Sequence, residues 1–231
     1  MDIIGCEYLY RSHAINTGGV LNIQHATALG TTAGGVTVAS GGALEIQGGI
    51  SVGAEALSLT GTGISSNGAL RNISGTNVYG GTITLAGATT IQSDANTLTL
   101  NAANAITATN QNLVIEGAGD GAISGTITTG SGTLTKNDAG TWTLSGANTY
   151  SGATTINAGT LSVNTMANAS SNSALGTGAT TAAITIGATG TLEYTGSGHS
   201  SSRAIVLSAS GGTIDASGSG ALILSGGITG S

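Results

Sequence analysis

The chain has 231 residues, of which 41 are glycine, none is proline and only 6% are charged. The net charge of −6 and the scattered basic residues Arg11, Arg71, Lys136 and Arg203 exclude the basic patch that neutralises nucleic-acid phosphates. The glycines follow no G-X-Y period, which excludes collagen, and no apolar run reaches the ~18–20 residues that span a bilayer.

Residues 1–17 differ in composition from the rest of the chain, with Cys6, Tyr8, Tyr10, Arg11 and His13 close together. We interpret 1–17 as an irregular N-terminal segment or an artificial boundary, and 18–231 as one repeat region. Because Cys6 is the sole cysteine, the chain can form no internal disulfide and no cysteine metal site.

From Gly18 onward, short apolar runs alternate with turns rich in Gly, Asn and Ser, the pattern of short strands. No window shows the spacing of an amphipathic helix, and the Ser and Asn content of 165–175 favours a loop there. The predicted strands are 20–23, 36–38, 43–46, 56–59, 69–73, 82–85, 89–92, 97–100, 105–108, 112–115, 122–128, 133–135, 141–144, 154–157, 160–163, 183–186, 191–194, 204–207, 213–215 and 221–224.

Distant segments of the chain resemble each other. Residues 36–38 match 184–186, and 42–46 match 190–194, both at an offset of 148. This indicates a duplicated array. Repeats of ~20–30 residues bury their apolar faces only by stacking on neighbours, which favours a solenoid over a sandwich. Roughly ten rungs at ~4.8 Å spacing would form a rod on the order of 50 Å long.

One stretch carries a family resemblance. It reads Leu134-Thr135-Lys136, Gly140, Trp142-Thr143-Leu144, Ser145-Gly146-Ala147-Asn148-Thr149-Tyr150, Gly152, Thr154-Thr155-Ile156 and Ala158-Gly159-Thr160-Leu161. It resembles the autotransporter-associated β-strand repeat of surface-exposed passenger regions in Gram-negative autotransporters. Asp138-Ala139 and Trp142 depart from the usual residues. The resemblance implies a right-handed parallel β-helix that displays surface, and no particular catalytic residue.

Several side chains are candidates for a functional site. Glu116 and Asp120 could approach each other across a turn, but solvated turn positions are the favoured interpretation. Residues 117–121 form a single Gly- and Asp-rich copy of a calcium-binding pattern that needs tandem copies. His13, His25 and His199, the last beside Ser200–Ser202, have no diagnostic spacing and are expected in exposed loops.

The remaining candidates are threonines, aromatic residues and one asparagine. Uneven gaps between the Thr-x-Thr runs argue against one flat ice-binding array, and Thr also suits an exposed strand face. Trp142 is expected in the core and Tyr150 at the surface. Asn148 would either stack on equivalent asparagines or lie exposed at a turn. The Thr-x-Thr runs are Thr82/Thr84, Thr97/Thr99, Thr107/Thr109, Thr126/Thr128, Thr133/Thr135 and Thr141/Thr143.

We therefore predict an all-β, right-handed parallel β-helix (a β-solenoid) that forms a single elongated array and is a fragment of a longer passenger. The expected function is a structural stalk or adhesin-like passenger segment at the cell surface, anchored through an outer-membrane barrel absent from this chain. We expect no catalytic, cofactor-binding or metal-ligating residue, no nucleic-acid partner and no membrane insertion. Expected partners are host or surface glycans or proteins, or further copies of the chain. The alternatives are a polysaccharide-processing enzyme and a glycan- or ice-binding solenoid, since one fold hosts all of these functions.

Overall fold

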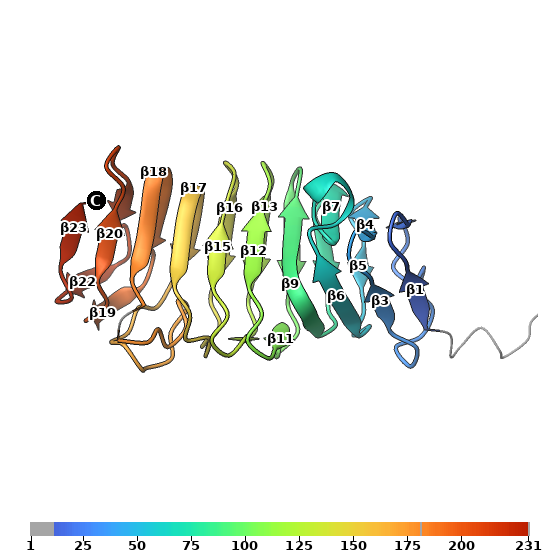
Figure 1. Ribbon diagram of the computed structural model, residues 1–231, viewed down its shortest axis with the longest axis horizontal. Helices are drawn as coiled ribbons and strands as arrows, with labels where there is room; N and C mark the ends of the chain where they lie inside the picture. Colours follow the sequence, from blue (N-terminus) through green and yellow to red (C-terminus); the bar gives the residue numbers. More distant parts are fainter. Residues whose placement is uncertain (1–11, 181, 231) are drawn as a thin grey trace, which may run out of the picture.

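The computed structural model describes residues 12–180 and 182–230, and the protein is all-β with strands that pair in parallel (Figure 1). The local cause is the alternation of apolar and polar residues. In β12 (Leu113–Glu116), Leu113 and Ile115 are buried while Val114 and Glu116 are partly exposed, because successive side chains point to opposite sides of a strand. Among the described residues, helical structure is limited to a 3-10 turn, η2 (Ile64–Ser66).

Each turn of the chain stacks on the preceding turn, and the coil has three faces. Hydrogen bonds between turns join residues 21, 23 or 26 positions apart. One turn is longer, since Ile156 pairs with Ile186 across the loop 164–183. Figure 1 shows the turns following one another along the long axis from blue to red. This confirms the predicted parallel β-solenoid.

Face 1 is formed by β1 (His13–Ile15), β3 (Val36–Val38), β6 (Leu57–Gly61), the first part of β9 (Ile83–Ser93), β11 (Ile106–Ala108), β14 (Ile127–Thr128), β19 (Ser197–Ser201) and β22 (Gly220–Leu224). Its strands pair in register from β1 to β14. An isolated bridge between Asn148 and Ser173 continues this position beyond β14. β19 and β22 then pair with each other beyond the loop 164–183.

Face 2 is formed by β2 (Val20–Ile23), β4 (Ala43–Gln47), β7 (Leu70–Ser74), the second part of β9, β12, β15 (Leu134–Lys136), the first parts of β17 (Thr154–Val163) and β18 (Ile184–Tyr194), β20 (Ile205–Leu207) and β23 (Ile228–Gly230). These strands pair without interruption. At about 4.8 Å per pairing, the ladder is about 43 Å long.

Face 3 is formed by β5 (Ser51–Val52), β8 (Asn77–Tyr79), β10 (Thr97–Leu100), β13 (Asp120–Ile123), β16 (Thr141–Leu144), the second parts of β17 and β18, and β21 (Thr213–Asp215). Its strands also pair turn by turn. In β17 and β18 the chain passes from face 2 to face 3 within one strand, with a bulge between Ile156 and Ala158.

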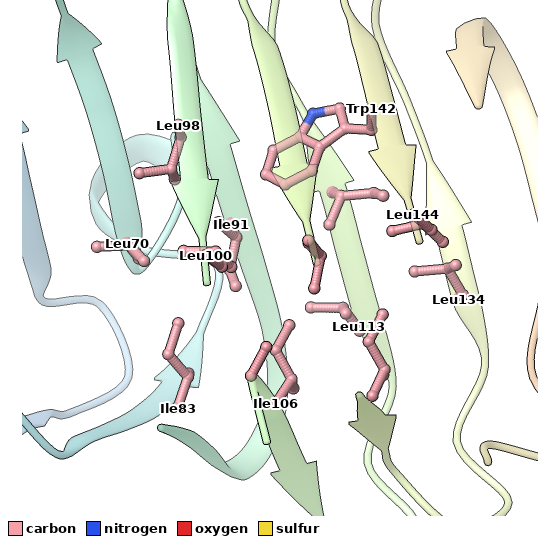
Figure 2. Close-up of a cluster of buried hydrophobic side chains, with 14 of the residues drawn as sticks. Leu70, Ile83, Ile91, Leu98, Leu100, Ile106, Leu113, Leu134, Trp142 and Leu144 are labelled. Carbon is pink, nitrogen blue, oxygen red and sulfur yellow. The ribbon is translucent and has the colours of Figure 1, made fainter. Parts of the chain in front are cut away.

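The core lies inside the coil and consists of columns of stacked aliphatic side chains. On face 2, Leu44, Leu70, Ile91 and Ile115 pair in succession, and each is 0% exposed. Figure 2 shows leucine and isoleucine side chains from all three faces pointing toward one another. Burial of each such side chain contributes ~1.5–3 kcal/mol, so stability is spread along the axis.

The strand prediction is largely confirmed, with boundaries displaced by a residue or two. Predicted pairs of short strands merge into β9, β17 and β18, while 122–128 is divided between β13 and β14. The loop favoured at 165–175 is present. The short strands β5, β8 and β23 and the Ser- and Gly-rich β19 were not predicted.

The N-terminal boundary can be compared only in part. His13–Ile15, which the sequence assigned to the irregular segment 1–17, form β1 and pair with β3. The ladder therefore reaches at least to His13. The other residues discussed there, including Cys6, lie outside the described residues.

The internal duplication has an arrangement that the sequence did not indicate. Val36–Val38 lie on face 1, whereas the matching residues 184–186 lie on face 2. Similarly, residues 42–46 lie at face 2, whereas the matching residues 190–194 lie at face 3. The second copy is thus rotated by one face relative to the first. This is possible because every face needs the same alternation of apolar and polar residues.

A shared turn supports a true duplication of structure. In both copies an Ala-Leu-Gly turn inserts its leucine, Leu29 or Leu175, into the core. The Gly30 N–H donates to Thr27 O at 3.0 Å, and the corresponding bond runs from Gly176 to Ser173, also at 3.0 Å. Both glycines have positive φ, a conformation that glycine adopts without steric cost.

The largest core side chain depends on a glycine in the neighbouring turn. Trp142 is 0% exposed and its Nε1–H donates to Glu116 O at 3.3 Å, which confirms the prediction that it lies in the core. Gly121 pairs with Trp142, and a Cβ at Gly121 would overlap the indole ring. Glycine at 121 therefore makes room for tryptophan at 142.

We expect Gly121→Ala to lower the free energy of unfolding by about 1–3 kcal/mol, because the added methyl group overpacks the core. In a Trp142→Leu background the same change should cost less than about 1 kcal/mol, since the smaller side chain leaves space. Urea unfolding of the four variants of this cycle measures both values. Equal costs in the two backgrounds would contradict the proposed contact.

Candidate functional site

The carboxylates weighed as catalytic acids are occupied by contacts with the next turn. Glu116 accepts a hydrogen bond from Asn137 Nδ2 at 3.1 Å, and burial raises its pKa. Asp120 Oδ1 accepts from the Thr141 N–H at 2.9 Å. In this region Asp138 Oδ2 accepts from the Gly117 N–H at 3.1 Å. These carboxylates link one turn to the next.

The described residues contain no group of three or more His, Cys, Asp or Glu side chains that could hold a metal ion. Asp120, the acidic residue of the single calcium-like stretch, is the acceptor for Thr141 described above.

The histidines are only partly where the sequence predicted them. His25 lies in an exposed loop with Nδ1 3.0 Å from Thr27 Oγ1, as expected. His13 and His199 instead lie in strands β1 and β19 and are half-buried. His199 Nδ1 is 2.7 Å from the Tyr194 hydroxyl, and the two rings meet edge to face. Half-burial follows from their positions in ladders rather than in loops.

Lys136 occupies a position in the core column of face 2, between Ile115 and Ile156. The side chain is 0% exposed, and its ammonium group donates to the carbonyls of Asn137, Asp138 and Ala158 at 2.6, 2.7 and 3.1 Å. Burial lowers its pKa to about 8, opposed by the charges of nearby carboxylates. The lysine thus satisfies three carbonyls at the corner between faces 2 and 3.

Asn148 and Tyr150 correct two predictions. Asn148 neither stacks on asparagines nor lies exposed: it is 0% exposed, accepts from the Ile127 N–H at 2.8 Å and donates to Ala174 O at 2.6 Å. It thereby bridges the turns on either side of it. Tyr150 is also 0% exposed, and its hydroxyl is 3.0 Å from Thr154 Oγ1. Both are covered by the loop of the next turn, where the Ala174 carbonyl accepts from Asn148 and the Thr177 N–H donates to Tyr150 O.

The loop 164–183 interrupts face 1 and is held from below by Arg203. This arginine is 3% exposed, and it donates to Leu175 O at 2.6 Å and to Ala182 O at 3.5 Å. A groove of about 620 Å³ lies between the loop and the strands β19 and β22. Met166, Asn168, His199 and the exposed Ile223 contribute to its lining.

Face 1 carries a column of hydroxyl side chains along its outer surface. Thr37 pairs with Ser58, Ser58 with Thr84, Thr84 with Thr107, and Thr107 with Thr128. We call these five residues the hydroxyl column. They are exposed or half-exposed, and Thr84 Oγ1 lies 3.3 Å from Thr107 Oγ1.

This column could not be predicted from the spacing of the Thr runs in the sequence, because the gaps between the runs are uneven. The gaps are uneven because the corners between faces differ in length. The strands of face 1 nevertheless stay in register, so the hydroxyl side chains are aligned. The signal that could have identified it is the recurring apolar-hydroxyl-apolar triplet: Val36-Thr37-Val38, Leu57-Ser58-Leu59 and Ile83-Thr84-Leu85.

The outer surface of face 2 has a different chemistry. Arg71 pairs with Glu45 at 3.3 Å and with Asp94 at 2.6 Å, and these hydrogen bonds raise the pKa of its guanidinium. Asn22 Nδ2 extends the row by donating to Glu45 at 3.1 Å. Such partly exposed pairs contribute only ~0–1 kcal/mol each, so they chiefly favour one register.

The fold and its outer columns define a β-solenoid that presents a long, repetitive surface. Residues 134–163 match the family described as the passenger-associated-transport-repeat, so this segment is an autotransporter passenger repeat. They comprise β15, β16 and β17, which pair without interruption on faces 2 and 3. The predicted resemblance is thereby confirmed.

A curated relative agrees with this. Over 76 residues the chain is 42% identical to the adhesin BmaC autotransporter of Brucella suis biovar 1 (strain 1330), covering 32% of this chain and 2% of that protein. The chain thus spans about 2% of the length of the relative it matches. No solved structure matches. In the described part of the chain, no helix is long and apolar enough to cross a membrane.

The buried lysine predicts a pH dependence of stability. The unfolded chain keeps the Lys136 proton up to its ordinary pKa, whereas the folded chain releases it near 8. Between about pH 8 and pH 10 the unfolded state therefore binds more protons, and stability rises with pH. Relative to Lys136→Met, the wild-type free energy of unfolding should rise by about 1–3 kcal/mol over this interval. Urea unfolding at several pH values measures the difference, and parallel curves would refute it.

The bridging asparagine predicts a loss of stability. Asn148→Ala leaves the buried Ile127 N–H and Ala174 carbonyl without their partner, which should lower the free energy of unfolding by about 2–4 kcal/mol. Asn157→Ala is the matched control, because Asn157 is exposed and its side chain donates to Asn137 Oδ1 across the surface. It should change stability by less than about 0.5 kcal/mol. Similar losses in both variants would argue against the bridge.

Proposed function

We propose that this chain is a non-catalytic passenger segment that acts as a stiff stalk at the cell surface and carries adhesive surface along its length. The observation that carries this proposal is the passenger repeat at 134–163, whose strands lie within the uninterrupted ladders of faces 2 and 3. The similarity to an adhesin autotransporter supports it. Host or surface glycans or proteins, or further copies of the chain, are the proposed partners, and the anchor is an outer-membrane region outside these residues.

The mechanical part of the function follows from the ladder. Each turn is fixed to its neighbours by hydrogen bonds on several faces and by the aliphatic columns between them. Bending the rod would break these bonds on one side, whereas a flexible linker has no such contacts. A surface on this coil is therefore held at a fixed distance and orientation.

Bead adhesion tests the proposal. Beads coated with the 231-residue chain should be retained on epithelial monolayers, on extracellular matrix or on a layer of the same chain, and albumin-coated beads of equal density should not. If the chain-coated beads were retained no better than the albumin-coated beads on every one of the three surfaces, the adhesive function would be contradicted. In parallel, the chain should release no reducing ends from a mixture of plant and bacterial polysaccharides; their release would favour an enzyme.

A further inference from the structure

Face 1 is free of charged residues along the whole described part of the coil. Its strands β1, β3, β6, β11, β14, β19 and β22, and the first part of β9, contain no Asp, Glu, Lys or Arg. Glu55, at the adjoining corner, is 3% exposed and accepts from the Gly35 N–H at 2.8 Å. Faces 2 and 3 carry charged side chains in β4, β7, β13 and β21.

This neutral face is also hollowed along the axis. One groove, of about 180 Å³, extends from Gly34 to Thr84, and a second, of about 620 Å³, extends from Thr84 to Thr128. Thr84 lines both, so the two grooves are neighbours along the axis. Besides the hydroxyl groups of Thr84, Thr107 and Thr128, the lining of the second groove includes Ala86, Ala108 and Gln111.

We propose that the grooved part of face 1, from Gly34 to Thr128, binds an uncharged linear glycan whose chain lies along the solenoid axis. The proposal rests on the adhesive function proposed above and names its ligand. Successive strands of face 1 stand about 4.8 Å apart, a length comparable to that of one sugar residue in an extended chain. Each turn of the protein can therefore meet one sugar.

The chemistry of the lining fits a neutral sugar chain. A threonine hydroxyl offers one donor and two acceptor positions, so Thr84 and Thr107 keep bonding capacity beyond their mutual contact. Their methyl groups and the exposed or half-exposed side chains of Ala86 and Ala108 suit the C–H faces of sugar rings. No charge has to be desolvated, and the strands hold the hydroxyls in place before binding, which lowers its entropic cost.

Face 3 provides an internal control. Thr141, Thr160, Thr191 and Thr213 also pair in register, so they form a second threonine column. Carboxylates accompany this column, because Asp120 accepts from the Thr141 N–H and Glu193 pairs with Asp215 beside it. A neutral glycan would have to displace water from these charges, and we expect no binding there.

Affinity electrophoresis of the full chain tests the proposal, with mixed-linkage β-glucan as the neutral probe and polygalacturonate as the anionic one. The β-glucan should retard the wild-type chain, and polygalacturonate should not. Thr84→Val with Thr107→Val keeps the β-branched shape and removes two hydroxyls, and should weaken binding about tenfold. Thr160→Val with Thr191→Val should bind as the wild type does. Thermal unfolding of each variant verifies that it is folded.

Several results would overturn the inference: no retardation by β-glucan, equal retardation by polygalacturonate, or equal loss in the face 3 variant. Inhibition of ice growth that is lost in the Thr84/Thr107 variant, without glucan binding, would also overturn it and assign face 1 to ice. The two proposals fail separately. Beads that adhere without glucan binding refute only the glycan ligand, whereas glucan binding by beads that fail to adhere refutes the adhesive function.

Discussion

The constraint on which this structure depends is that every turn must present the same side-chain parity as the turns beside it. A slip of one residue would exchange the inner and outer side chains of a strand. On face 2 this alternation is fixed by the buried column of Leu44, Leu70, Ile91 and Ile115. Outer residues are then aligned as well, so the hydroxyl column of face 1 follows from the register of the core beneath it.

The corners between faces impose a second requirement, because they turn backbone carbonyls toward the interior. Buried donors meet it at several levels of the coil. Asn72 donates to Ala95 O at 2.9 Å, Asn77 to Ser74 O at 2.8 Å, and Lys136 and Trp142 serve the corners that follow. The small interior of each turn can therefore contain polar side chains without loss of stability, provided that each side chain has its hydrogen-bond partners.

Much of the architecture could be predicted from the sequence, because alternation within a strand and glycine-rich turns are local signals. The passenger repeat was found for the same reason, since its pattern lies within one continuous stretch. Burial of Asn148 and Tyr150 could not be predicted, since it depends on residues one turn away. The hydroxyl column was missed for a related reason: corners of unequal length separate its members, and only the pairing of Thr84 with Thr107 and Thr128 aligns them. Short strands such as Ser51–Val52 have too few residues to show alternation.

The one-face rotation between the two internal copies affects how a longer array would meet its surroundings. If further copies were added in the same manner, each would present a given motif on the next face around the axis. Equivalent surfaces would then be distributed over all three faces of the filament. A binding partner could therefore meet such a surface from any direction around the axis.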